Sequence, residues 1–181
     1  IGLLSDGGVH SHISHLEELL LILSENSCKK VYLHLFTDGR DVDPKSGIKY
    51  VKKIEGFLKK TTGKIVSIIG RYYSMDRDFN FDRTREAYKL LVNGVGKKTN
   101  DFKKEIELSY NKNITDEFLE PLSIGKKSYL IKEGDVVISF NFRSDRMRQI
   151  TRMLSQKDFS YGGSKPLNLY YLTMTNYDDT L

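Results

Sequence analysis

Short apolar runs alternate with amphipathic stretches along most of the chain. Runs rich in β-branched and aromatic residues at positions 31–36, 64–69, 135–140 and 167–174 predict strands, and residues 1–4 resemble the end of another. Apolar residues at helical spacing predict helices over positions 11–23, 47–58, 82–92 and about 141–154. This alternation favours an α/β fold, with a largely parallel sheet covered by helices on both faces.

Residues 93–134 interrupt the alternation. Glycines, lysines and short apolar pieces such as residues 118–119 and 128–131 predict an insertion that carries a small antiparallel hairpin. The 181 residues suit one domain, since domains commonly contain about 100–150 residues. The chain opens inside a strand pattern without an initiator Met and stops within a polar run, so we expect a piece of a longer protein.

Composition argues against several classes of protein. Hydrophobic residues make up 39% and charged residues 29%, as in ordinary folded domains. No apolar run reaches the roughly 18–20 residues that span a bilayer, so no membrane association is expected. The single Cys28 cannot form an internal disulfide, which makes a reducing cytoplasm the simplest compartment.

The net charge of +5, from 29 Lys and Arg against 24 Asp and Glu, favours anionic partners. The lysines are scattered, whereas nucleic-acid-binding proteins usually gather basic residues into one strip, so no nucleic acid is expected as partner. The arginines are placed differently, because several follow the carboxyl ends of predicted strands, where α/β proteins bind ligands. These residues are Arg40, Arg71, Arg77, Arg143 and Arg146.

Most of the unusual residues lie in the strand-end loops 5–12, 38–41, 70–78 and 141–146. A small phosphorylated carboxylate carries about three negative charges, and guanidinium groups are the best donors for such an anion. Arg143 and Arg146 would share one face of a predicted helix start, where backbone N–H groups add to an anion site. The alternative is that these arginines form surface ion pairs with Asp145 and its neighbours.

The histidines have different expected roles. His10 follows a glycine turn, where it is well placed to donate a hydrogen bond to a phosphate or hydroxyl group. His12 and His15 are three positions apart on the first predicted helix, but the three or four ligands of a typical zinc site are missing. His34 lies inside a predicted buried strand and is interpreted as a core histidine with a hydrogen-bond partner.

Asp41 follows Arg40, and the adjacent cation favours an ionised carboxylate that can accept a proton at neutral pH. Asp41 equally suits a cap for the next helix, and both roles stay open. The sequence contains no Walker-type phosphate loop, nucleotide fingerprint, serine-elbow motif or metal-ligand carboxylate cluster. The chain is therefore predicted to bind an anion better than it can cleave one.

Segments 2–12, 38–41, 70–78 and 141–146 have the sequences GLLSDGGVHSH, DGRD, GRYYSMDRD and NFRSDR. Taken together and in this order, they resemble the cofactor-independent phosphoglycerate mutases. The resemblance covers essentially the whole chain, but only the inserted transferase domain of that two-domain family. It implies an isomerase of glycolysis and gluconeogenesis that interconverts 3-phosphoglycerate and 2-phosphoglycerate without 2,3-bisphosphoglycerate.

In that family, two Mn²⁺ or Mg²⁺ ions and a phosphoryl-accepting serine belong to a second domain, which is similar to alkaline phosphatases and is absent from this chain. The resemblance implies that this chain binds no metal, is inactive alone, and holds glycerate until the phosphoserine returns the phosphoryl group. Its expected partners are the phosphoglycerate substrate and the parent enzyme's phosphatase-like domain, in a cytoplasmic monomer. The alternative is a stand-alone anion-binding regulatory domain. The family's substrate-binding positions match His10, Arg40, Asp41, Arg71, Arg77, Arg143 and Arg146, with Asp41 as the acid–base residue.

Overall fold

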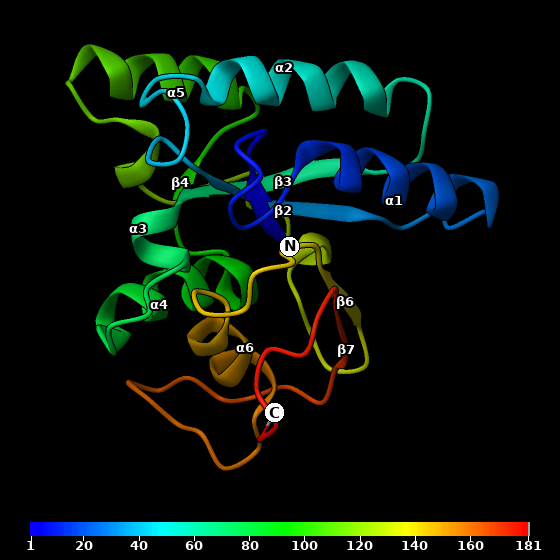
Figure 1. Cartoon of the computed structure of the whole chain (residues 1–181), viewed down its shortest axis with the longest axis vertical. Coiled ribbons are helices and arrows are strands. Elements are labelled where there is room, and N and C mark those ends of the chain that lie inside the picture. Colours follow the sequence, from blue (N-terminus) through cyan, green and yellow to red (C-terminus); the bar gives the residue numbers. More distant parts are fainter. Residues whose placement is uncertain (181) are drawn as a thin grey trace.

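The computed structural model describes residues 1–180, the side chain of Ser128 excepted, and its main element is a five-stranded sheet (Figure 1). Three of its strands run parallel, with Gly2 opposite Leu35 and Thr37 opposite Gly70. Two shorter strands extend the sheet in the order β1-β2-β3-β5-β4. The strands are β1 (Gly2–Leu4), β2 (Tyr32–Thr37), β3 (Lys64–Gly70), β4 (Lys97–Lys98) and β5 (Leu122–Ser123).

A parallel pair, β6 (Val136–Ser139) and β7 (Tyr170–Thr173), lies beyond the β1 edge. The amino group of Ile1 donates to the carbonyl of Ile138 at 2.7 Å, and Phe140 N–H donates to the carbonyl of Ile1 at 3.0 Å. These bonds place β6 beside β1. The carboxyl ends of β1, β2, β3 and β6 therefore lead to neighbouring loops.

Helices cover both faces of the sheet, as the sequence pattern predicts (Figure 1). Neighbouring residues of one strand point to opposite faces, so Leu4 and Leu35 join one core while Leu3 and Phe36 join the other. The first core packs against α1 (Ile13–Glu25), α2 (Gly47–Leu58) and α5 (Phe102–Asn111). The second packs against α4 (Phe81–Tyr88), the π-helix Lys89–Asn93 that continues it, and α6 (Arg148–Ser155).

The predicted hairpin in residues 93–134 is wrong. Strands β4 and β5 pair in parallel with α5 between them, and the antiparallel pairing joins β5 to β3. Asp101 caps α5 by accepting from the N–H of Lys104 at 3.1 Å, and Phe102 and Ile106 bury one side of the helix. This apolar spacing of four is helical but sparse, and lysines and glutamates separate the apolar positions. Short 3₁₀ turns, Asp116–Phe118 and Lys127–Tyr129, complete the segment.

A second difference concerns residues 141–147, which form a loop, because α6 begins at Arg148. The N–H groups of Phe142 and Arg143 both donate to the carbonyl of His10, at 2.9 and 3.2 Å. These bonds tie the loop after β6 to the loop after β1. They also rule out the expected helix start at Arg143 and Arg146. None of the helices in residues 1–180 combines the length and apolar character that crossing a membrane requires.

Candidate functional site

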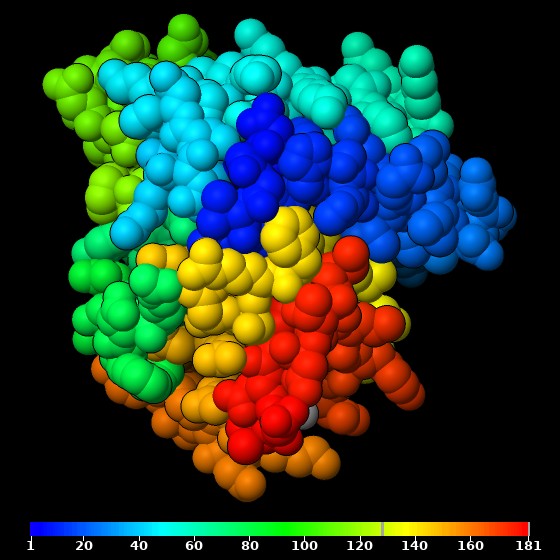
Figure 2. All heavy atoms as spheres, in the orientation of Figure 1, coloured from blue at the N-terminus to red at the C-terminus, as the bar shows by residue number. Residues whose placement is uncertain are grey.

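The predicted loops meet at the carboxyl ends of β1, β2, β3 and β6. Figure 2 shows them as adjoining blue, light-blue, green and yellow surfaces on one face of the molecule. Polar contacts cross between the loops: Arg71 after β3 reaches Asp38 after β2, and Arg77 reaches Asp145 after β6. The structure therefore brings together side chains from loops that are far apart in the sequence.

Arg71 is the most enclosed arginine of this group. Its side chain is 2% exposed, and Nη1 donates to Asp38 Oδ1 at 2.6 Å and to Asp41 Oδ2. It lies in the short helix α3 (Arg71–Ser74), which starts directly after β3. Burial by itself lowers the pKa of Arg71, but the bonds to Asp41 and Asp38 outweigh burial and hold this pKa above its ordinary value. Arg71 is thus a buried cation that joins the segment after β3 to the loop after β2.

Asp38 organises the loop after β2. It accepts from the hydroxyl of Ser5 at 2.6 Å and from the N–H groups of Arg40 and Asp41 at 3.2 and 3.0 Å. Burial raises the pKa of Asp38, but the bonds from Ser5, the Asp41 N–H and Arg71 outweigh burial and leave it below its usual range. Asp38 was not among the site residues predicted from the sequence. The available signal was the pair Asp38-Gly39 directly after a predicted strand, which is typical of a turn. In the structure Asp38 accepts from the N–H groups two and three residues later, and Gly39 has φ of +66°.

Asp41 is directed to Arg71 and lies well before the next helix. Helix α2 begins after Ser46, and the N–H of Gly47 donates to Asp116 Oδ2 at 2.7 Å. The helix-cap role of Asp41 is therefore wrong. Its carboxylate is 19% exposed and faces His10 Nε2 at 3.7 Å.

Asp145 contacts two of the predicted arginines. It accepts two hydrogen bonds from Arg143, at 2.9 Å from Nε and 3.0 Å from Nη2, and one from Arg77 Nη1 at 2.7 Å. Burial raises the pKa of Asp145, but the hydrogen bonds from Arg77 and Arg143 outweigh burial and lower it. The alternative of ion pairs with Asp145 is thus correct for Arg143 and wrong for Arg146, which donates to the carbonyl of Met75. Asp145 was predicted only as an ion-pair partner and not as a site residue.

His10 lies near the carboxylates of both Asp41 and Asp145 and is 3% exposed. Its Nδ1 is 3.6 Å from Asp145 Oδ1 and has no hydrogen-bond partner among the described residues. Burial, followed by the charge of Arg71, lowers the pKa of His10 to about 4. The imidazole is therefore neutral near pH 7, with one nitrogen able to donate and the other able to accept.

Arg40 and Arg146 complete the predicted set. Arg40 is 54% exposed and contacts Glu117 Oε1 at 3.3 Å, while Arg146 Nη1 donates to the carbonyl of Met75 at 3.1 Å. Burial, together with the charges of Arg71, Arg77 and Arg40, lowers the pKa of Arg146. The arginines thus lie close enough to act on one another, and their combined field attracts an anion.

The metal hypothesis for the histidines has no support in residues 1–180, where no group of three His, Cys, Asp or Glu side chains could hold a metal ion. His12 caps α1 by accepting from the N–H of Ser14 at 3.2 Å. His34 is buried in β2 and forms a 2.7 Å hydrogen bond with Ser67, as expected for a core histidine. These side chains have structural partners.

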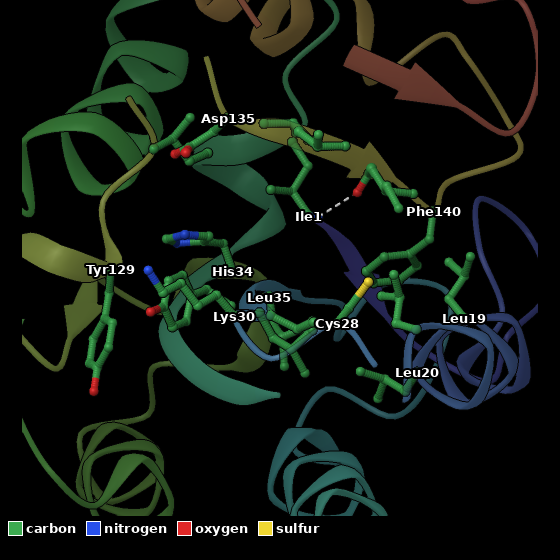
Figure 3. Close-up of a pocket in the computed structure, with 18 of the residues that line it drawn as sticks. Ile1, Leu19, Leu20, Cys28, Lys30, His34, Leu35, Tyr129, Asp135 and Phe140 are labelled. Carbon is green, nitrogen blue, oxygen red and sulfur yellow. Dashed lines mark hydrogen bonds between the residues drawn. The ribbon is translucent and has the colours of Figure 1, made fainter. Parts of the chain in front are cut away.

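An apolar cavity of about 680 Å³ lies at the opposite, amino-terminal end of β2 and β6. Figure 3 shows Leu19, Leu20 and Phe140 among its lining residues. The cavity shares no residue with the strand-end loops. It is therefore separate from the arginine site.

The comparisons with known proteins agree with this architecture. Residues 1–179 match the family described as BPG-independent PGAM N-terminus (iPGM_N). Relatives named 2,3-bisphosphoglycerate-independent phosphoglycerate mutase occur in Flavobacterium johnsoniae, 53% identical over 184 residues, and Bacteroides fragilis, 47% identical over 179 residues. These matches cover 99% and 98% of this chain but 36% of each relative, so the chain spans about a third of their length.

A solved structure has the same fold. The chain is similar to Leishmania mexicana phosphoglycerate mutase, crystallised at low cobalt concentration, with a TM-score of 0.91 and 28% identity. The match covers 98% of this chain and 35% of that one. On the family match over nearly its full length, this chain belongs to the BPG-independent phosphoglycerate mutase N-terminal family.

Proposed function

We propose that this chain is the substrate-binding transferase domain of a cytoplasmic phosphoglycerate mutase, an isomerase that interconverts 3-phosphoglycerate and 2-phosphoglycerate in glycolysis and gluconeogenesis. The observation that carries the proposal is the convergence of arginines from separate strand-end loops around buried Arg71, Asp38 and His10. Family membership and the relatives' names support the same activity. The substrate-binding positions in this proposal are His10, Arg40, Asp41, Arg71, Arg77, Arg143 and Arg146.

The charges of the site suit a small, multiply charged anion. Four of the five arginines pair with carboxylates of Asp38, Asp41, Glu117 and Asp145, whereas Arg146 donates to the carbonyl of Met75. Guanidinium groups can bind phosphate and carboxylate oxygens with paired hydrogen bonds. Arginines from several loops can therefore hold both ends of one phosphoglycerate.

Asp41 is proposed as the acid–base residue at the glycerate hydroxyl groups. Arg71 and the N–H bond to Asp38 fix its position, and its partial exposure leaves the carboxylate accessible to a ligand. Proton transfer by a positioned carboxylate typically contributes 10²–10⁴-fold to a rate. Neutral His10, which faces Asp41, is proposed to hydrogen-bond a phosphate or hydroxyl oxygen.

The remaining chemistry is assigned to a phosphatase-like part of the longer enzyme. The described residues do not fit a Mn²⁺ or Mg²⁺ site, so this chain is given no metal-dependent step. Its task is to keep glycerate oriented between the two phosphoryl transfers, while the closed site excludes water that would hydrolyse a phosphoserine. No 2,3-bisphosphoglycerate is needed in this scheme, and the longer enzyme is proposed to act as a monomer.

The proposal is tested in the longer mutase by replacing Arg146 with Ala. Loss of one charged contact to the substrate should cost about 2–4 kcal/mol in kcat/KM. Arg85→Ala is the matched control, because Arg85 pairs with Asp82, which is 73% exposed, outside the four loops. Normal kcat and KM in Arg146→Ala would remove this arginine from the substrate site. A longer protein that binds phosphoglycerate without turnover would favour the regulatory alternative.

A further inference from the structure

Asp145 differs from the other carboxylates of the site because it holds two proposed substrate-binding arginines at once. Its oxygens accept from Nε and Nη2 of Arg143 and from Nη1 of Arg77. These arginines come from the loops after β6 and β3, so one carboxylate links two separate segments. Building on the proposed function, we propose that Asp145 is a positioning residue that orders Arg77 and Arg143 for phosphoglycerate before the substrate binds.

Burial indicates which side of the cluster faces the ligand. Asp145 is 26% exposed, while Arg77 and Arg143 are 41% and 46% exposed, and the neighbouring His10 is 3% exposed. The Asp145 side chain is thus less exposed than the two arginine side chains that it holds. A carboxylate that merely occupied the ligand's position would be expected on the open side of the arginines.

The hydrogen-bond pattern leaves both arginines able to bind an anion. Asp145 uses the Nε and Nη2 edge of Arg143, and within the described part of the chain Nη1 of Arg143 makes no hydrogen bond. For Arg77, Nε and Nη2 remain unused among the same residues. Each guanidinium has five N–H donors, so these contacts fix its orientation without exhausting its donors.

The expected effect follows from the cost of ordering long side chains. Immobilising a rotamer-rich side chain opposes binding, and an ion pair already present in the unbound protein removes part of that cost. For two arginines we expect about a tenfold gain in affinity, which corresponds to about 1.4 kcal/mol. Simple electrostatics predicts the opposite sign, since removing the negative charge of Asp145 makes the site more attractive to anions.

The test is Asp145→Asn in the longer mutase, with dissociation constants for 3-phosphoglycerate and inorganic phosphate measured by calorimetry. The amide has nearly the same shape, but it cannot accept from both arginines as a carboxylate does. We expect about tenfold weaker binding of 3-phosphoglycerate, a raised KM, a smaller change in kcat and an unchanged Tm. Glu105→Gln is the control, because Glu105 is also a partly buried carboxylate in an ion pair. It lies on α5, away from these loops, and pairs with Lys97.

Each other outcome has a defined meaning. Equal or tighter 3-phosphoglycerate binding by Asp145→Asn would overturn the positioning role and leave only the charge effect. A drop in Tm, with kcat and KM impaired alike and not rescued by Asp145→Glu, would show a purely structural role and would also overturn it. If the unmodified mutase itself did not bind 3-phosphoglycerate, the proposed function would fail instead.

Discussion

Replacing Arg71 with Met would remove the cation between Asp38 and Asp41 while keeping a long apolar side chain. Arg71 and Asp38 are 2% and 1% exposed, so the substitution leaves the Asp38 carboxylate buried without its cationic partner. Breaking a buried ion pair in this way typically costs about 3–5 kcal/mol. Asp38 would keep its bonds from Ser5 and the loop N–H groups, and Asp41 reaches solvent, so we expect a loss near the lower limit, about 3 kcal/mol.

The loss of stability caused by Arg71→Met should depend on pH. In the unmodified chain the pKa of Asp38 is lowered, so its stabilisation is present above the unfolded-state pKa and is lost as pH falls. Without Arg71, burial would raise the pKa of Asp38, and protonation would relieve the penalty as pH falls. The difference in unfolding free energy between the two proteins should therefore be largest near pH 7 and shrink towards pH 4.

Urea unfolding of both proteins at pH 7, 5.5 and 4, followed by circular dichroism, measures this difference. Arg85→Met is the control and should cost at most about 1 kcal/mol, because its partner Asp82 is 73% exposed. A loss that stays the same at all three pH values would contradict the charge argument and point to packing. A loss below 1 kcal/mol at pH 7 would show that Asp38 does not need Arg71.

Two further predictions concern protonation. The pKa values of His10 and His34 are lowered to about 4 and about 3 in the folded chain. Below about pH 6.5 these histidines therefore bind protons in the unfolded chain but stay neutral in the folded chain. As pH falls from 7 to 5, each histidine should lower the free energy of unfolding by about 1–2 kcal/mol. In denaturant titrations over this range, His10→Gln should remove the contribution of His10 and leave that of His34. In the longer mutase, Asp41→Asn should lower kcat at least about a hundredfold with substrate affinity retained; activity within about threefold would exclude an acid–base role.

The parts of the fold predicted from sequence depend on local patterns. The strands that carry the site are continuous apolar runs ended by glycine or polar residues, and a run buried on both faces is recognisable without knowing its neighbours. Because parallel strands end at the same edge, the loops after β2, β3 and β6 were expected to meet, and the contacts of Arg71 with Asp38 and of Arg77 with Asp145 show that they do. Their chemical roles remain predictions.

The missed features depend on contacts between distant segments. Asp38 and Asp145 are ordinary loop aspartates in the sequence, and only the fold places Arg71 and Arg77 within reach of them. Residues 141–147 were expected to begin the helix that follows, but the N–H groups of Phe142 and Arg143 bond to the carbonyl of His10 instead. In both cases the local sequence is compatible with more than one structure, and contacts with distant segments select one of them.

The arginines fall into two groups by exposure, and this division bears on how a phosphoglycerate would be held. Arg71 is enclosed and fixed by carboxylates, whereas Arg40, Arg77 and Arg143 are 41–54% exposed. Ion pairs to exposed arginines contribute little in water, because solvent screens them. The same contacts strengthen when a second protein surface excludes water, since the effective dielectric constant falls. Under the proposed function, in which a second domain covers the substrate, the contacts of the exposed arginines would therefore strengthen more than that of Arg71.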